Sequence, residues 1–305
     1  MLSGTARWHP RSHHCGVSVT YKYAVIIPHY NDVARLDRCL DVLVNSPHSD
    51  CEIVVADNMS SDPMDEIRAR YPMVRFIEEP EKGAAMARNR GVAETSAPVL
   101  FFIDADCVPA PDWFLTATRV CGNADLIGGR VDVFDETPPP RSGAEALEAV
   151  FAFNFRTYVE KQGFAGSGNL LTRREVFADV GGFVHGLSED LDWCHRARAK
   201  GYRLIYEDRL CVSHPSRQDW AALRRKWHRL TEELYGVNGS TLRARLRWAI
   251  RALAMPLSAV VHTPKILFSR KLSSAGERWR GVVTLFRLRL LRAGWMLRQA
   301  LGLAI

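Results

Sequence analysis

The sequence of 305 residues predicts an α/β fold, in which a sheet is flanked by helices, followed by a basic, amphipathic helical extension. Two observations carry this prediction. Apolar runs of strand length alternate with segments of helical periodicity from about residue 21 to residue 216, as they do in βαβ units. After residue 216, arginine is interleaved with leucine, phenylalanine and tryptophan, which is typical of amphipathic helices.

These patterns divide the chain into three parts. We expect a flexible extension at residues 1–20, an α/β domain at residues 21–216 and a helical tail at residues 217–305. A proline run divides the α/β domain into halves at residues 21–137 and 138–216. The extension contains no continuous apolar segment, so no secretory signal is expected there. His9, His13, His14 and Cys15 could bind a metal, but their spacing fits no rigid site and favours a mobile polar leader.

The first half is predicted to hold four strands that alternate with helices. The apolar run AVIIP, residues 24–28, is typical of a buried parallel strand. Residues 33–44 then place three leucines on one helical face. Further strands are predicted at residues 52–57, 74–78 and 99–106, with helices at residues 84–94 and after Pro111.

The second half is predicted to be more irregular, and it follows a strand at residues 125–134 that contains a glycine pair. We expect, in chain order, a helix near residues 143–160, a glycine-rich turn at residues 163–169, a helix at residues 173–180 and a strand at residues 202–206. The acidic segment SEDLDW precedes the last of these strands and begins a stretch with helical charge spacing.

Three aspartates follow strands of the first half. Asp57 ends one strand, and Asp104 and Asp106 end the most apolar one, VLFFIDAD. Ligands of open α/β sheets collect beyond the carboxyl ends of the strands, so the three carboxylates should converge at one rim. Asp104 and Asp106 occupy alternate positions of one strand face and can share one hard cation, Mg²⁺ or Mn²⁺. Such a cation would offset the charge that develops on a departing diphosphate.

Further candidate residues lie in the acidic segment and beyond it. Glu189 and Asp190 begin a predicted helix, where a carboxylate either stabilises the helix N-terminus or acts as a general base. The position of Asp190 near glycines and after the metal strand favours the base, whereas the helix terminus explains Asp192 better. His214 follows a short apolar stretch and is either a structural histidine or a further metal ligand.

The helix that begins after Gly83 offers two more polar candidates. We expect Arg88 and Asn89 to contact a nucleotide phosphate or ribose, because this helix starts at the same rim; a solvated helix face is the alternative for Arg88. The sequence lacks GxxxxGK[ST] and a GxGxxG after the first strand, which disfavours phosphate-loop kinases and dinucleotide oxidoreductases. Seven cysteines without a CxxC pair indicate reduced thiols in a reducing compartment.

Six blocks of the sequence, taken in order, resemble the family 2 glycosyltransferases with a GT-A fold, from about Tyr23 to His214. The blocks are VIIPHYND at 25–32, VVADNMSSD at 54–62, KGAAMARNRG at 82–91, FFIDAD at 101–106, GSGNLLTRREVFADVGGF at 166–183 and SEDLDWCHRARAKGY at 188–202. The ordered set is far more specific than any one block. It implies the nucleotide-diphospho-sugar transferase fold, a Rossmann-like mixed sheet flanked by helices.

The resemblance also implies roles for residues of the nucleotide pocket. Asp57 corresponds to an aspartate that accepts a hydrogen bond from the pyrimidine ring of the donor. Pro28, Tyr30 and Asn31 correspond to the lining of that pocket. A UDP-sugar is therefore the expected donor.

For the reacting groups, the resemblance implies a metal site and a base. Asp104 corresponds to a residue near the ribose and the metal, Asp106 to the direct metal ligand and His214 to a further metal or diphosphate contact. Asp190 corresponds to the catalytic base of an ED pair, with Glu189 beside it among the residues expected to bind the nucleotide-sugar. The bound cofactor is expected to be Mg²⁺ or Mn²⁺.

Gly168 and Asn169 correspond to a loop near the donor sugar and the acceptor. The implied reaction is an inverting, metal-dependent transfer of a sugar to a hydroxyl of a glycan or lipid-linked acceptor, as in cell-surface polysaccharide synthesis. The alternatives are a nucleotide-sugar-binding protein without turnover and a membrane scaffold. The intact set of Asp104, Asp106 and Asp190 favours the enzyme.

The tail differs sharply in charge from the rest of the chain. Residues 217–305 contain 18 lysines and arginines and 4 acidic residues, whereas residues 1–216 contain 23 and 30. The longest uncharged stretch of the tail, residues 252–261, is about half the length that spans a bilayer. We expect the tail to lie on an anionic membrane surface, which makes the protein cytoplasmic and peripheral to the membrane. Packing on the catalytic domain or on a second subunit is the alternative, and nucleic-acid binding is disfavoured by the aliphatic content.

Overall fold

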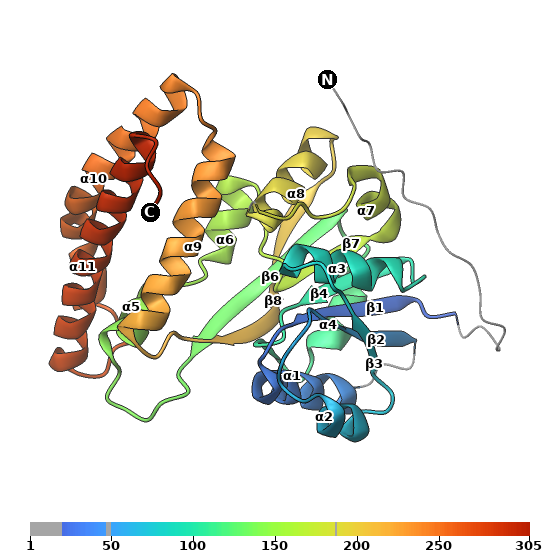
Figure 1. Cartoon of the computed structure of the whole chain (residues 1–305). Helices are drawn as coiled ribbons and strands as arrows, with labels where there is room; N and C mark the ends of the chain where they lie inside the picture. Colours follow the sequence, from blue (N-terminus) through green and yellow to red (C-terminus); the bar gives the residue numbers. More distant parts are fainter. Residues whose placement is uncertain (1–19, 47–49, 187) are drawn as a thin grey trace.

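The computed structural model describes residues 20–46, 50–186 and 188–305, and the expectations for the N-terminal extension fall almost wholly outside this part. The described chain forms an eight-stranded mixed sheet with helices on both faces and a group of long helices at one end (Figure 1). The strand order is β3-β2-β1-β4-β7-β6-β8-β5. The predicted α/β fold is therefore confirmed.

The sheet combines a parallel nucleotide-side half with an antiparallel insertion. Its strands are β1 (Tyr23–His29), β2 (Cys51–Asp57), β3 (Arg75–Glu78), β4 (Val99–Ile103), β5 (Val108–Pro109), β6 (Leu126–Phe134), β7 (Asn169–Arg173) and β8 (Leu204–Pro215). Strands β3, β2, β1 and β4 are parallel, and β7 runs antiparallel to both β4 and β6. The carboxyl ends of β1, β2 and β4 consequently lie at one rim of the sheet.

Alternation along the strands gives the sheet two apolar faces. In β1, Val25 and Ile27 join one core cluster and Ala24 and Ile26 join the other. The first cluster packs on α1 (Val33–Asn45), α2 (Asp65–Arg70) and α4 (Trp113–Val120), and the second on α3 (Ala84–Ala93), α7 (Arg174–Val180) and α8 (Glu189–Ala199). The site is thus held by a sheet whose strands are buried on both faces.

The helical end of the molecule has its own apolar core. Its elements are α5 (Gly143–Phe151), α9 (Trp220–Asn238), α10 (Leu242–Leu267) and α11 (Ala275–Ala300). Buried side chains of all four helices form one cluster, and α11 lies so close to α5 that a Cβ at Gly143 would be 2.1 Å from Thr284 Oγ1. The inner face of the tail therefore packs on α5, while an apolar stripe on the outer face of α10 stays exposed.

Several predicted elements differ from the structure. The helix expected near residues 143–160 is broken, because Phe153 adopts a φ of +55° and the Asn154 side chain accepts a hydrogen bond from Thr157 N. The short α6 (Phe155–Thr157) and a π-turn at Tyr158–Gln162 follow this break. Strand β7 was not predicted, because its five residues follow a glycine-rich turn that dominates the local pattern.

Candidate active site

A cavity of about 670 Å³ lies between the rim of the sheet and the long helices. Its sheet end is lined by residues that follow β1 and β4 and by the start of α8, namely Tyr30, Asp104, Asp106, Glu189 and Asp190. Its helical end is lined by side chains of α5, α9 and α11. The apolar ones include Leu147, Phe151, Trp227, Leu230, Leu285 and Leu288, and the charged ones are Glu148, Lys226, Arg229, Glu233 and Arg289. One continuous space thus joins a carboxylate-rich end to an end that combines apolar and charged side chains.

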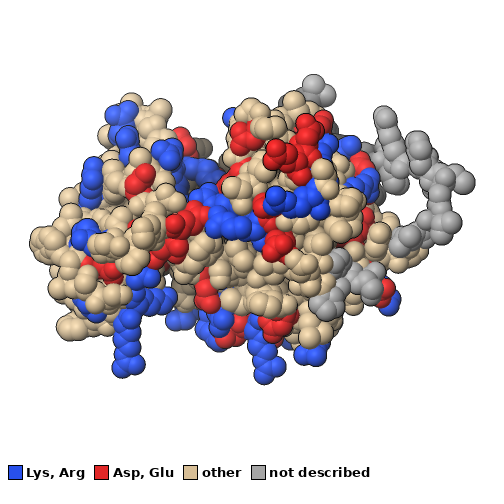
Figure 2. All heavy atoms as spheres, turned by 90° about the horizontal axis from the view of Figure 1, so that it is seen from below, with Lys and Arg blue, Asp and Glu red and all other residues tan. Residues whose placement is uncertain are grey.

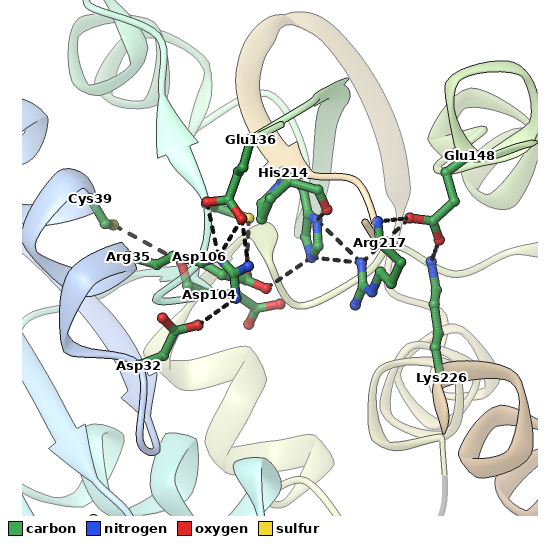
Figure 3. A network of polar contacts seen from close by, with 12 residues as sticks. Asp32, Arg35, Cys39, Asp104, Asp106, Glu136, Glu148, His214, Arg217 and Lys226 are labelled. Carbon is green, nitrogen blue, oxygen red and sulfur yellow. Dashed lines mark hydrogen bonds and ion pairs between the residues drawn. The ribbon is translucent and has the colours of Figure 1, made fainter. Parts of the chain in front are cut away.

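Asp106 and His214 come together at the sheet end. The predicted strand at residues 99–106 is shorter in the structure, since β4 ends at Ile103 and Asp106 lies in the turn that follows. Asp106 Oδ2 lies 3.1 Å from Nε2 of His214, whose Nδ1 donates to the carbonyl of Pro215 at 2.6 Å (Figure 3). Burial opposes ionisation of Asp106, but His214, Arg217 and Arg35 together outweigh it and lower the pKa of Asp106 to about 2.

The donor set of Asp106 and His214 fits a divalent cation. When His214 Nδ1 donates its proton to the carbonyl of Pro215, His214 Nε2 faces the carboxylate oxygen of Asp106. This contact is attractive only when a proton or a metal ion lies at Nε2. Asp104, the predicted third ligand, does not join this pair, because its Oδ1 is paired with Arg88. Within the described ranges, no three His, Cys, Asp or Glu side chains surround one point as metal ligands.

Arg88 connects the DxD turn to α8. It is only 3% exposed, and its guanidinium lies 2.5 Å from Asp104 Oδ1 and 2.9 Å from Glu189 Oε1. Burial alone would lower the pKa of Arg88, but the charges of Asp104 and Glu189 raise it instead. The alternative for Arg88, a place on a solvated helix face, is therefore wrong. Its guanidinium instead connects the two acidic segments by hydrogen bonds to Asp104 and Glu189.

Asp190 presents one carboxylate oxygen to the cavity. Its Oδ1 accepts hydrogen bonds from Leu191 N at 2.7 Å and Ser188 Oγ at 3.3 Å, whereas no described residue donates to Oδ2. Burial and repulsion from Glu189 raise the pKa of Asp190 to about 6. Asp190 thus has the geometry and the proton affinity that a general base requires near neutral pH.

The loop containing Gly168 passes between the two acidic segments. A Cβ at Gly168 would be 2.7 Å from Asp104 Oδ2, and one at Gly166 would be 3.6 Å from Asp190 Oδ2. Only glycine at 168 lets the backbone approach Asp104 so closely, whereas at Gly166 a side chain would collide with the Phe155 ring, 2.5 Å away, and not with Asp190. Gly168 lines the cavity as predicted, and the loop limits the space in which a ligand can meet Asp104 and Asp190.

Asn169 and Asn89 do not face the cavity, contrary to the prediction that they bind the nucleotide-sugar. Asn169 is 0% exposed, donates to the carbonyls of Arg130 and Leu210, and accepts from Trp113 Nε1. The Asn89 side chain bonds both the N–H and the carbonyl of Phe183. Their amides satisfy buried backbone groups, which is a requirement that sequence patterns do not reveal.

The end of β1 forms the side of the cavity where the nucleotide pocket is expected. Pro28 and Tyr30 line it, and Tyr30 is 55% exposed. Asp57 lies behind them and bonds His29 Nδ1 at 2.8 Å and Ser60 Oγ at 2.6 Å, so that these bonds outweigh burial and lower the pKa of Asp57. Asn31 is turned away, because its Oδ1 accepts from the backbone at residues 61 and 62.

Sequence reasoning missed four residues that matter for this cavity. His29 orients Asp57 and lines the cavity, and Arg217 lies 3.4 Å from the His214 ring nitrogens. Lys226, partly buried on α9, pairs with Glu148 at 2.5 Å (Figure 3). Glu233, also on α9, lines the cavity, and burial together with Glu189 and Asp190 raises its pKa to about 7. The residues on α9 and α5 carry no motif, so only the packing of the helices brings them here.

Comparisons with known proteins agree with this geometry. The chain is 29% identical over 215 residues to glycosyltransferase AglE of Haloferax volcanii, a match that covers 67% of this chain and 70% of that protein. It is 28% identical over 212 residues to the pre-mycofactocin glycosyltransferase of Mycobacterium tuberculosis, where the match covers 65% of this chain and 44% of the relative. The chain therefore spans less than half of the mycobacterial protein.

Solved structures of glycosyltransferases share the fold. The mannosyltransferase PcManGT from Pyrobaculum calidifontis, in complex with GDP-Man and Mn²⁺, superposes with a TM-score of 0.59 at 18% identity, over 90% of this chain and 87% of that one. S. aureus TarS 1-349 in complex with UDP-GlcNAc superposes with a TM-score of 0.52 at 17% identity, over 92% and 80%. The predicted GT-A fold is confirmed by these likenesses. Since the model of glycosyl transferase family 2 matches residues 24–181, more than half of the chain, the protein belongs to that family and is a glycosyltransferase.

Proposed function

We propose that this enzyme transfers a sugar from a nucleotide-diphosphate donor to a hydroxyl of a glycan or lipid-linked acceptor, with inversion at the anomeric carbon. The observation that carries the proposal is the cavity itself, where the free Oδ2 of Asp190 and the pair of Asp106 and His214 face one space. A base for the acceptor and a binding site for the diphosphate are therefore next to each other.

Asp190 acts on the acceptor hydroxyl in this proposal. Its Oδ2 accepts the hydroxyl proton while the oxygen forms a bond to the anomeric carbon, and the bond from that carbon to the diphosphate oxygen breaks. The electron pair leaves with the nucleoside diphosphate. A single displacement inverts the anomeric configuration and requires no nucleophile on the protein, unlike the two-carboxylate retaining glycosidases.

Asp106 and His214 are the residues that would hold Mg²⁺ or Mn²⁺. When bound, the cation supplies positive charge that stabilises the departing diphosphate. Arg217, which lies against the His214 ring, adds a fixed positive charge on the same side. Arg88 keeps Asp104 and Glu189 in place. The related fold of PcManGT, solved with Mn²⁺, supports this assignment.

A UDP-sugar is the donor that we propose, with the pyrimidine ring near Pro28, His29 and Tyr30. The exposed Tyr30 ring is placed to stack on a base, and Asp57 holds His29 in one orientation. The neighbours with UDP-GlcNAc and with GDP-Man define the two donor classes that a test must separate.

A donor screen tests the catalytic proposal directly. Purified protein is incubated with UDP-, GDP- and dTDP-sugars and Mn²⁺, and release of the nucleoside diphosphate is measured, with Asp190→Asn as the control for background hydrolysis. We expect release from a UDP-sugar that the variant lacks, and an inverted anomeric configuration in the product by NMR. Retention of configuration would overturn the role of Asp190, and full activity with excess chelator would overturn the role of the cation.

We further propose that the enzyme works at an anionic membrane surface on the cytoplasmic side. One face of α10 exposes the apolar residues Leu242, Leu246, Ile250, Leu253, Leu257 and Val261, called here the α10 stripe. Exposed arginines flank it at residues 243, 247 and 251. In Figure 2 the helical part, at the left, shows broad uncharged surface bordered by Lys and Arg. This arrangement suits a helix lying in a lipid interface.

Among the helices that the structure describes, none is long and apolar enough to cross a membrane.

Flotation with vesicles tests the membrane proposal. Serine at Leu246, Leu253 and Leu257 together should release the protein from vesicles of phosphatidylglycerol and phosphatidylcholine, because burial of the stripe no longer stabilises the bound state. Leu115→Ser, at an exposed leucine of α4, is the matched control and should float as the wild type does. Equal flotation of wild type and triple variant would contradict the proposal.

A further inference from the structure

Two arginines at the helical end of the cavity lack a negative partner. Arg289 lines the cavity, and its only hydrogen bond to a described residue goes to the Met255 sulfur at 3.5 Å. Arg292, three residues further along the same face of α11, is 6% exposed and stacks on Trp227 with 4.1 Å between its Cζ and the ring centroid. Its Nε has no hydrogen-bond partner among the residues that the structure describes. Neither arginine forms an ion pair within the described part of the chain.

Other buried cations of the cavity are neutralised. Arg88 bonds two carboxylates, and Lys226 bonds Glu148. A buried guanidinium without a partner is costly to the fold, so its presence requires a gain elsewhere. Burial lowers the pKa of both Arg289 and Arg292, the latter to about 9, which reflects how poorly their charge is compensated. An anion that arrives with a ligand would provide the missing charge.

The surroundings of Arg289 indicate what kind of anion fits. The same end of the cavity is lined by Leu147 and Phe151 of α5 and by Leu285 and Leu288 of α11. A freely soluble anion would gain nothing from this apolar lining, whereas a phosphate attached to an aliphatic chain would use both the cation and the leucines. Helix α10, which carries the exposed α10 stripe, packs directly on α11. The apolar residues of the cavity and the α10 stripe therefore belong to two helices that pack on each other.

We propose that the helical end of the cavity binds the anionic headgroup of a lipid-linked acceptor, in which a phosphate or diphosphate is joined to an apolar chain. Arg289 contacts the phosphate directly. Arg292, behind Trp227, positions that ring and adds positive field, and the chain lies along the leucines of α5 and α11. The acceptor hydroxyl then extends toward Asp190 at the sheet end. This inference rests on the proposed function, because it names which of the two acceptor classes the enzyme uses.

Binding of three probes tests the inference without turnover. Farnesyl phosphate, farnesol and inorganic phosphate are titrated by calorimetry into the full chain and into Arg289→Gln, Arg292→Gln and Arg292→Lys. Arg287→Gln, which removes an exposed arginine of the same helix, is the matched control. Binding of UDP with Mn²⁺ is measured on every protein, so that loss of the donor site is seen separately.

We expect farnesyl phosphate to bind the wild type at least tenfold more tightly than either other probe. Arg289→Gln and Arg292→Gln should each weaken it tenfold or more, Arg292→Lys should restore most of the loss, and Arg287→Gln should change nothing. UDP binding should be equal in all five proteins. The inference would be overturned, even if UDP binds, if farnesol bound as tightly as farnesyl phosphate, if inorganic phosphate bound more tightly, or if Arg289→Gln had no effect. Failure to bind UDP while farnesyl phosphate binds would instead count against the proposed donor site alone.

Discussion

The two ends of the cavity differ in how completely their charged side chains are paired. At the sheet end, Asp104 and Glu189 both contact the guanidinium of Arg88, and Asp106 contacts the ring of His214. At the helical end, Arg289 and Arg292 contact none of the described carboxylates, and apolar side chains surround them. Paired charges hold a geometry in the absence of ligand, whereas unpaired buried charges raise the energy of the empty protein.

The difference in charge pairing distinguishes residues that stabilise the site from residues that are free to bind a ligand. Arg88 connects two acidic segments that are far apart in sequence, so it serves the fold first. Asp190 and Arg289 each keep polar atoms that no described residue contacts by a hydrogen bond, so they are the groups expected to act on a ligand. Variants at paired and unpaired positions should therefore change stability in opposite directions, while activity follows the unpaired ones.

The largest effect is expected for Asp190→Asn. Loss of the base should lower kcat by roughly 10²- to 10⁴-fold while the affinity for the donor stays near that of the wild type. Because the carboxyl has a pKa raised to about 6, it is ionised above that pH, and wild-type kcat/KM should fall as the pH drops below 6. Steady-state kinetics from pH 5 to 8 check both points. If the Asp190→Asn variant bound the donor weakly but turned it over normally, Asp190 would serve only to stabilise the N-terminus of α8.

A large loss of stability is expected for Arg88→Met. The change leaves Asp104 and Glu189 repelling each other without a cation, and because both are partly exposed we expect a loss of about 3 kcal/mol in the free energy of unfolding. Arg90→Met, at an exposed arginine of α3 that pairs with Glu94, is the control and should cost less than about 1 kcal/mol. Urea denaturation followed by circular dichroism measures both. Equal losses of unfolding free energy in the two variants would show that Arg88 does not hold the two acidic segments together.

Smaller changes of opposite sign are expected at the helical end. Lys226→Met leaves the buried Glu148 with Arg217 as its only remaining described cation and should destabilise the fold by about 2 kcal/mol. Arg292→Met removes an uncompensated buried charge and should stabilise it by about 1 kcal/mol. Thermal unfolding of the two variants and the wild type measures both changes in stability. Destabilisation by Arg292→Met would mean that its stacking on Trp227 outweighs the cost of its charge.

Much of the parallel half of the sheet could be predicted from the sequence. The strands that became β1 and β2 and the helix that became α1 lie within one or two residues of the prediction, because their apolar periodicity is local and strong. The acidic rim followed from the same reasoning, since chain order places Asp104 and Asp106 after a buried strand. Asp190 at the start of α8 was likewise visible in the acidic segment.

The sequence by itself determined the order of the βαβ units, the positions of the carboxylates and the contrast between an acidic domain and a basic tail. Only the tertiary structure decided which charges are paired, because ion pairs such as Arg88 with Glu189 join residues 101 positions apart. The same holds for Asn169, whose amide satisfies buried carbonyls, and for Arg292, whose isolation depends on how α9 and α11 pack. Periodicity reports the burial of a residue, whereas its partners depend on contacts between distant segments.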